Sequence, residues 1–282
     1  MGIDISTARF LASEMRRGVP FGCTLTLGRQ GIYMEASRYK ECVAALGHSI
    51  SRSDYADDLF HALGAIKTDV MDVSNYEGAS VIHDLNQPVD ASLHGRYDCV
   101  FDGGALEHVF NLPVALQNCM EMTKPGGHFI IVTPCNNFCG HGFYQFSPEL
   151  FYSALAPVNG FSVERLLFVY RNRWYSIRDP SDIKARIELL TDEPTSLFIS
   201  AKRCEQKPLF RNWPQQSDYI QMWNSNQLVA QPPQPVRSAK ETILRALPAL
   251  RRLQTRWREL NRHRKCSPRN RDWFMPIDID KV

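Results

Sequence analysis

The stretch from Tyr97 to Pro134 constrains the fold of this chain more than any other. It begins with an apolar, β-favouring run over Tyr97–Phe101, which ends at an Asp-Gly-Gly turn. Apolar residues then recur at helical spacing from Leu106 to Met120, and a Pro-Gly-Gly turn at 125–127 ends that pattern. A continuous apolar run follows at 129–132, as expected of a strand covered on both faces. Strand, helix and strand in this order predict a βαβ crossover between two parallel strands.

The carboxyl ends of parallel strands meet at one edge of their sheet. In open α/β sheets, ligands bind outside those ends. We therefore expect residues 102–108, which follow the first strand of the crossover, to lie beside residues 134–141, which follow the second. This rim is where the sequence predicts a functional site.

Further strands are expected before and after the crossover. Apolar runs predict them at 22–27, 65–73 and 80–83, and an antiparallel pair at 161–170 and 196–202. The sequence thus predicts an α/β fold with a doubly wound, mostly parallel seven-stranded sheet that has helices on both faces. The helices expected around these strands cover residues 3–17, 33–46, 54–63, 147–155 and 183–190.

Composition and charge divide the chain into three parts. Residues 1–204 contain the predicted sheet, 205–235 form a linker rich in proline and glutamine, and 236–282 form a basic amphipathic helical extension with a break at Pro248. From 237 to 271, twelve basic residues stand against two acidic ones. This tail therefore carries +10, which leaves −7 for the rest of a chain whose net charge is +3.

Two roles remain open for the basic tail. Its apolar residues recur every three or four positions from Ile243 to Leu260, opposite the arginines. Such a stripe either docks on the body, which we favour, or lies on an anionic membrane surface through residues 237–271. Nucleic acid is not expected as a partner, because Trp257 is the one aromatic residue among these basic side chains.

Eight cysteines occur without the spacing of a disulfide framework. No apolar run reaches transmembrane length, and the N-terminus lacks the apolar core of a signal peptide. We therefore expect a cytoplasmic, reduced protein, peripheral to the inner membrane surface if the tail binds there. Cys135, Cys139 and His141 suggest a metal site, but no fourth ligand is visible nearby, so no metal is expected.

The order of these features is similar to that of class I S-adenosylmethionine-dependent methyltransferases. The resemblance covers about residues 20–204, and its most specific parts are YDCVFDGGALEHV and KPGGHFIIVTP. The segment GHGFYQFSPELF extends it to methyltransferase-like proteins of bacterial polysaccharide clusters. The family implies S-adenosylmethionine as the cofactor and methyl transfer to a small-molecule or glycan-like acceptor, at oxygen.

The resemblance also implies where the cofactor binds. The turn after the first strand would hold its methionine part, and the acid after the second strand would accept hydrogen bonds from the ribose hydroxyls. The acid after the third strand, with its neighbour, would contact the adenine, and the turn after the fourth strand would line the sulfonium. In this order, the implied residues are Gly28, Gln30 and Gly31, then Asp72, then Asp84 and Leu85, then Asp102, Gly103 and Gly104.

The turn after the first strand departs from the family pattern. The family has Gly-x-Gly-x-Gly there, whereas this chain keeps only Gly28 and Gly31. Without the middle glycine the backbone approaches a ligand less closely. Gln30 is the candidate for a compensating amide contact, and Arg29 for an ion pair with the cofactor carboxylate. The alternative is a non-catalytic protein of methyltransferase fold that acts through partner or membrane-surface binding.

His108 and His141 are the candidate catalytic residues. Methyl transfer needs no metal and depends mainly on holding two reactants in line. A general base assists when the nucleophile is a hydroxyl, and both imidazoles fall on the predicted rim. For His108, a purely architectural role in the cofactor site is the alternative. Tyr144 is expected to form a wall of the acceptor pocket.

Overall fold

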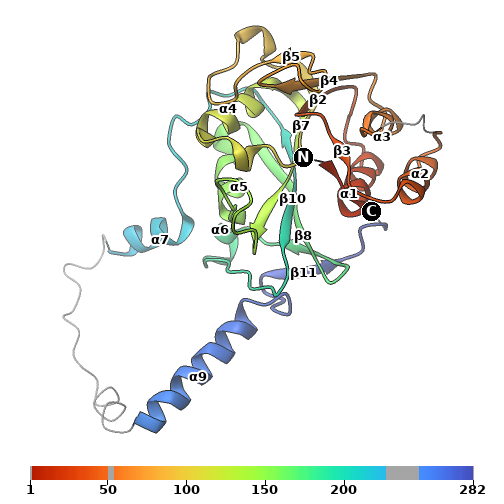
Figure 1. The fold of residues 1–282 in the computed structure, drawn as a ribbon. Coiled ribbons are helices and arrows are strands. Elements are labelled where there is room, and N and C mark those ends of the chain that lie inside the picture. Colours follow the sequence, from red (N-terminus) through yellow and green to blue (C-terminus); the bar gives the residue numbers. More distant parts are fainter. Residues whose placement is uncertain (1, 50–53, 227–247, 282) are drawn as a thin grey trace.

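The computed structural model describes residues 2–49, 54–226 and 248–281. Its fold is α/β, with one large central sheet and helices on both faces (Figure 1). The strands of this sheet are β2 (Cys23–Leu27), β4 (Lys67–Asp72), β5 (Val81–Ile82), β6 (Tyr97–Asp102), β7 (Thr123–Asn136), β8 (Phe161–Tyr170), β9 (Arg173–Ile177), β10 (Thr195–Arg203) and β11 (Phe274–Ile277).

Helices and a small second sheet complete the described structure. The α-helices are α1 (Ile5–Arg16), α2 (Ala36–Ala44), α3 (Asp57–Ala62), α4 (Leu112–Met122), α5 (Pro148–Ala154), α6 (Pro180–Ile183), α7 (Ser217–Asn226) and α9 (Pro248–Lys265). Short 3-10 helices are η1 (Ala91–Leu93), η2 (Leu106–His108) and η3 (Pro157–Asn159). The second sheet is the parallel pair β1 (Gly2–Ile3) and β3 (Gly31–Ile32).

The central sheet has a parallel half and an antiparallel half, in the order β11-β9-β8-β10-β7-β6-β2-β4-β5. The five strands from β7 to β5 are parallel to one another, and the other four add antiparallel pairs. The predicted α/β fold and the parallel crossover from β6 to β7 are confirmed. Among the described residues the sheet has nine strands rather than the predicted seven, because β9 and β11 extend the antiparallel half.

Alternating side chains of the central strands build a separate core on each face. In β6, Cys99 and Phe101 belong to the core beneath α1, α2 and α3, whereas Val100 belongs to the core beneath α4 and α5. Figure 1 shows these two groups of helices on opposite sides of the sheet. The central strands are therefore covered on both sides, which is why β6 and β7 hold continuous apolar runs at 99–101 and 129–132.

Two predicted helices differ from the structure. The helix expected from Leu106 begins only at Leu112, because η2 comes first and Pro113 lies in the first turn of α4. The helix expected over 183–190 is wrong. There α6 ends at Ile183, since Lys184 adopts a left-handed conformation with φ 51° at the helix end.

The projecting helix α9 corrects the expectation for the basic tail. It extends away from the body (Figure 1), and Trp257 and Leu260 are 65% and 63% exposed. The favoured docking of the apolar stripe on the body is therefore wrong for these residues. Pro248, where a break was expected, is the first residue of α9. Residues 236–247, which hold Ile243 and Leu247 of the stripe, lie outside the described residues.

The residues after α9 return to the central sheet, so this end of the basic extension is part of the folded body. Cys266, Trp273 and Phe274 are buried, and β11 pairs with β9. Asp280 forms an ion pair of 2.5 Å with Arg9 of α1. None of the helices in the described parts of the chain combines the length and the apolar character of a membrane-spanning segment.

Candidate functional site

The carboxyl ends of the five parallel strands form one edge of the sheet, here called the rim. Chain order reverses at β2, because β4 and β5 lie on one side of it and β6 and β7 on the other. In open α/β sheets, ligands bind outside the strand ends at such a reversal. The expected ligand position is therefore the β2–β6 junction, which comprises residues 27–31 at the end of β2 and residues 102–104 at the end of β6.

The turn after β2 places a buried glutamine against the end of β6. Gly28 has φ 66°, a left-handed conformation that favours glycine. The buried Gln30 donates from Nε2 to the carbonyl oxygens of Leu27 (2.9 Å) and Gly28 (3.2 Å). Its Oε1 accepts no hydrogen bond and would lie 2.2 Å from a Cβ atom at Gly103. The structure thus brings together Gln30 and Gly103, and the absence of a side chain at 103 makes this approach feasible.

The other two residues of this turn have different partners. Arg29 forms an ion pair with Asp57 at 2.7 Å. Because Asp57 already balances this charge, the prediction that Arg29 pairs with a cofactor carboxylate is not supported. Gly31 lies in β3 and pairs with Gly2 of β1, whose N–H donates to the carbonyl of Gly103 at 3.2 Å. The N-terminal segment therefore contacts the β2–β6 junction, which the sequence did not indicate.

Two carboxylates follow β4 and β5 on the same rim. Asp72 is the last residue of β4 and half-buried, and its Oδ1 accepts the N–H of Val73 at 2.6 Å. Asp84 is exposed, and hydrogen bonds from the backbone and the side chain of Asn86 (2.9 and 2.8 Å) hold its pKa below the usual value. Leu85 packs on the core beneath α4. Among the described residues, neither carboxylate forms an ion pair with a lysine or an arginine.

Two carboxyl groups are buried at the end of β6. Asp102 and Glu107 are 0% and 1% exposed. Asp102 Oδ1 accepts the N–H of Ala105 at 2.7 Å, whereas its Oδ2 has no partner. Burial, reinforced by the charge of Glu107, raises the pKa of Asp102 to about 8. The β2–β6 junction therefore holds two buried acceptor oxygens without donors, one from Asp102 and one from Gln30.

The raised pKa of Asp102 predicts a pH-dependent loss of stability. The unfolded chain releases this proton near its ordinary pKa of 3.8, whereas the folded chain retains it until about pH 8. Stability therefore falls as pH rises through that window and the loss is complete above it. Asp102→Asn keeps an acceptor for Ala105 and cannot ionise. Urea unfolding at pH 4 and pH 8 measures the difference in the free energy of unfolding between the variant and the wild type. We expect this difference to shift in favour of the variant by at least ~1.4 kcal/mol from pH 4 to pH 8. Equal pH dependence in both proteins would contradict this assignment.

The two candidate histidines meet on the rim. The rings of His108 and His141 have their centroids 5.2 Å apart and are exposed. His141 Nε2 lies 3.5 Å from Oε1 of Glu107, whose Oε2 accepts a hydrogen bond of 3.4 Å from Thr133. Glu107 was missed as a functional residue. Its position next to the candidate His108 could have pointed to Glu107 in the sequence. The contact of Glu107 with His141 could not, because it depends on how the loop after β7 folds.

The donor atoms of Glu107, His108 and His141 all lie within 4.8 Å of one another. They form the one such group of three or more among the residues that the structure describes, and neither Cys135 nor Cys139 belongs to it. Three protein ligands are one fewer than a structural zinc site uses, but two histidines and a glutamate with an open fourth position are a ligand set of catalytic zinc sites. The expected absence of a metal therefore stays a prediction, and the same side chains can also act as acid–base groups.

Exposed aromatic rings stand next to these histidines. Phe110 and Phe143 are 72% and 67% exposed, and their rings are in edge-to-face contact at 5.8 Å. The hydroxyl of Tyr144 donates to the carbonyl of Phe110 at 2.7 Å, and the N–H of Phe143 donates to the carbonyl of Glu107 at 2.7 Å. These bonds attach the aromatic loop to the rim. Exposed rings beside polar groups are typical of a surface that binds a small organic molecule.

No protein-family model and no curated protein sequence matches this chain. Similar solved structures include 1,6-didemethyltoxoflavin-N1-methyltransferase of Burkholderia thailandensis with bound 1,6-didemethyltoxoflavin and S-adenosylhomocysteine (14% identity, 70% of this chain and 77% of that one, TM-score 0.40). The branched-chain polyamine synthase of Thermus thermophilus is 12% identical over 74% of this chain and 59% of that one, with a TM-score of 0.41. TehB of Haemophilus influenzae is 13% identical over 68% of this chain and 61% of that one, with a TM-score of 0.38. At these TM-scores we take no residue role or activity from the similarity.

Proposed function

We propose that this protein is an S-adenosylmethionine-dependent methyltransferase. The observation that carries the proposal is the pair of buried acceptors without donors, Gln30 Oε1 and Asp102 Oδ2, at the reversal point of the sheet. Buried acceptors normally have a donor. The ammonium group of the cofactor's methionine part supplies three donors and a positive charge, and that charge would favour the ionised form of Asp102, which otherwise keeps its proton until about pH 8.

The carboxylates of the neighbouring strands fit the rest of the cofactor. Asp72 at the end of β4 would accept hydrogen bonds from two ribose hydroxyls, and Asp84 after β5, with Leu85, would contact the adenine. The bound cofactor would supply an activated methyl group. The residues of this chain would hold the cofactor and the acceptor in line, which accounts for most of the acceleration in such reactions.

The acceptor is proposed to be a small molecule or a glycan-like compound that is methylated at oxygen. His141, held by Glu107, and His108 beside it are positioned to take the proton of a hydroxyl nucleophile. The exposed rings of Phe110 and Phe143 would pack on the face of the acceptor. No protein or nucleic-acid acceptor is needed to account for these groups.

Calorimetric titration with S-adenosylmethionine tests the proposal. We expect saturable binding to the wild type and at least tenfold weaker binding to Asp72→Ala, because two hydrogen bonds to a charged group are lost. Asp90→Ala, which removes an exposed carboxylate from η1, is the matched control and should bind like the wild type.

Two outcomes would contradict different parts of the proposal. If Asp72→Ala bound the cofactor with full affinity, the role of Asp72 in binding the ribose would be rejected. If the wild type did not bind at millimolar cofactor, the proposal that the protein is a methyltransferase would be rejected. The non-catalytic alternative would then take its place, with the exposed Trp257, Leu260 and arginines of α9 as the surface for an anionic membrane.

A further inference from the structure

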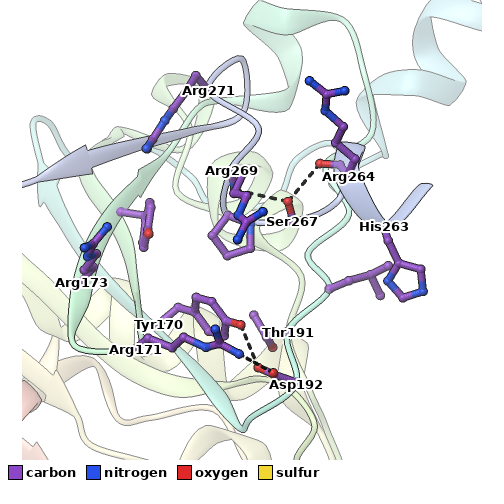
Figure 2. A pocket seen from close by; sticks show the side chains of 13 residues that line it. Tyr170, Arg171, Arg173, Thr191, Asp192, His263, Arg264, Ser267, Arg269 and Arg271 are labelled. Carbon is purple, nitrogen blue, oxygen red and sulfur yellow. Dashed lines mark hydrogen bonds and ion pairs between the residues drawn. The ribbon is translucent and has the colours of Figure 1, made fainter. Parts of the chain in front are cut away.

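A cavity of about 1010 Å³ lies between the β8–β9 hairpin and the segment after α9 (Figure 2). The hairpin contributes Arg171 and Arg173, and the segment from the end of α9 contributes Arg264, Arg269 and Arg271. Together with one carboxylate, from Asp192, the five guanidinium groups give the lining a formal charge of +4. The rest of the wall includes hydroxyl, aromatic and imidazole groups from Tyr170, Tyr175, Thr191, Ser267 and His263.

The positive charge of this cavity is largely unbalanced. Arg171 is the arginine that Asp192 neutralises, through an ion pair of 2.6 Å. Figure 2 shows Arg173, Arg264, Arg269 and Arg271 around the opening without a dashed contact from any guanidinium. Within the described residues, none of these four guanidinium groups forms an ion pair. Like charges repel one another across a shared cavity, so this arrangement favours binding of an anion.

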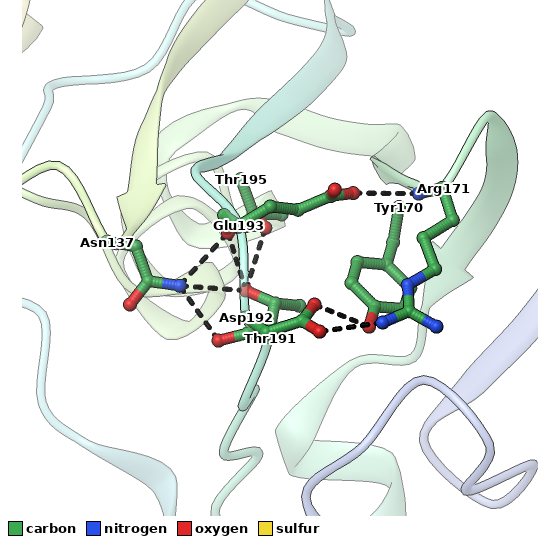
Figure 3. Close-up of polar contacts among 7 residues, drawn as sticks. All are labelled: Asn137, Tyr170, Arg171, Thr191, Asp192, Glu193 and Thr195. Carbon is green, nitrogen blue, oxygen red and sulfur yellow. Dashed lines mark hydrogen bonds and ion pairs between the residues drawn. The ribbon is translucent and has the colours of Figure 1, made fainter.

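The hairpin side of the cavity is held in a defined position. Arg171 and Asn172 have φ 49° and 58°, so the two-residue turn between β8 and β9 is of the left-handed type that matches strand twist. Figure 3 shows how this turn is attached to the loop before β10. Asp192 accepts from the hydroxyl of Tyr170 at 2.8 Å, and Glu193 accepts from the N–H of Arg171 at 2.9 Å. The same loop is fastened to the end of β7 by Asn137, which donates to the carbonyls of Thr191 and Glu193.

The opposite side of the cavity is held by a short hydrogen-bonded turn. Ser267 Oγ donates to the carbonyl of Arg264 at 3.0 Å and accepts the N–H of Arg269 at 3.3 Å. Asn270 Nδ2 donates to the carbonyl of Lys265 at 2.7 Å. Buried Cys266 accepts, through its carbonyl, the N–H of Leu190 at 2.8 Å. Apart from the ion pair of Arg171 with Asp192, the contacts that position the two walls do not use the guanidinium groups of the lining.

We propose that this arginine-lined cavity binds a ligand through its diphosphate group. Guanidinium groups bind phosphate oxygens through paired N–H donors, and four unpaired ones are enough for two adjacent phosphates. A cavity of about 1010 Å³ exceeds the space that a diphosphate needs. The tyrosines and hydroxyls of the wall then contact the organic group that the diphosphate carries. This site is independent of the methyl-transfer proposal, because none of its residues belongs to the β2–β6 junction.

The cavity nevertheless lies on the same edge of the sheet as the rim. β10 runs antiparallel to β7, with Thr195 opposite Asn136, and β8 runs antiparallel to β10. Tyr170 at the end of β8 is therefore at the edge where β6 and β7 end. Three strand spacings of about 4.8 Å separate β6 from β8, which is roughly 14 Å.

Calorimetric titration of the full chain with inorganic pyrophosphate tests this site. We expect saturable binding that weakens as salt is added, and at least a tenfold loss of affinity in the double variant R269A/R271A. Both side chains are exposed, so their removal leaves the core intact. The matched control is R256A/R258A, which removes two exposed arginines from α9 outside the cavity and should bind pyrophosphate like the wild type.

Two results would overturn the proposal: no binding of pyrophosphate to the wild type at millimolar concentration, or equal losses in the two double variants. A second arm identifies the source of the diphosphate. Co-sedimentation with phosphatidylcholine vesicles, with and without a polyprenyl diphosphate lipid, is compared for the same proteins. Sedimentation that requires Arg269 and Arg271 and is reversed by pyrophosphate supports a lipid headgroup. Pyrophosphate binding without such sedimentation supports a soluble diphosphate.

Discussion

Replacing Arg165 by methionine is expected to lower the free energy of unfolding by about 3–5 kcal/mol. Arg165 lies in β8 and is buried, and its Nη1 donates to Oε1 of Glu14 and to Oγ of Ser13, both at 2.7 Å. Glu14, on α1, is 0% exposed. Without the arginine, the ion-pair partner left to its carboxylate among the described residues would be Arg17, at 4.0 Å. The expected cost is therefore that of an unpaired buried charge between α1 and the sheet.

A double variant separates this cost from simple loss of packing. In Glu14→Met with Arg165→Met, both charges are gone and two apolar side chains of similar volume fill the space. Replacing a buried ion pair in this way is often close to neutral. Urea unfolding should therefore show the double variant to be more stable than Arg165→Met alone. If the two variants were equally unstable, the loss would come from packing and the electrostatic explanation would fail.

Gly103→Ala is expected to weaken binding of S-adenosylmethionine about 100-fold, or ~2.7 kcal/mol. A Cβ atom at this position would lie 2.2 Å from Gln30 Oε1 and 2.8 Å from Cε1 of Phe101. Phe101 belongs to the core, so the more mobile Gln30 side chain would be displaced from the carbonyls of Leu27 and Gly28. The acceptor that we assign to the cofactor ammonium would then be lost, and the methyl group would occupy its place.

Calorimetry with the folded variant measures this effect, and thermal unfolding verifies that the fold is retained. The matched control is Gly22→Ala at the other end of β2, where a Cβ would lie 2.6 Å from Asp98 Oδ2. In that variant the new methyl group would also crowd a side chain, that of Asp98, but at the end of β2 away from the rim. We expect it to bind the cofactor like the wild type. Unchanged affinity in Gly103→Ala would show that the cofactor does not use the β2–β6 junction.

In the parallel half, β6 and β7 were the most predictable strands, because each holds a continuous apolar run, at 99–101 and 129–132. A strand that is covered on both faces is apolar over its buried centre, so its composition marks it. β9 and β11 lack this mark. Arg173 and Ser176 interrupt β9, and Pro276 interrupts β11, which is acceptable only because β11 is the edge strand. Their existence depends on pairing with each other and with β8, which no local pattern encodes.

The acidic positions of the candidate site were predictable for a related reason. Asp72 and Asp102 are each the last residue of a parallel strand, and parallel strands bring their carboxyl ends to one rim. The partners of these groups were not predictable. Gln30 folds back over its own turn, and Glu107 reaches His141 across a loop, so these contacts follow from three-dimensional packing. The pKa of Asp102 has the same origin, since burial is its main cause.

The sequence by itself therefore determined the βαβ crossover of Tyr97–Pro134, the parallel half of the sheet and the chemical character of its rim. Hydrophobic periodicity and turn residues are local properties, and local properties are written in consecutive residues. The tertiary structure alone decided which charges remain unpaired. It buried Asp102 beside Glu107, balanced Arg29 with Asp57, and gathered arginines of the β8–β9 hairpin and the chain end around one cavity. These outcomes depend on distances between residues far apart in the chain, and such distances exist only once the sheet has formed.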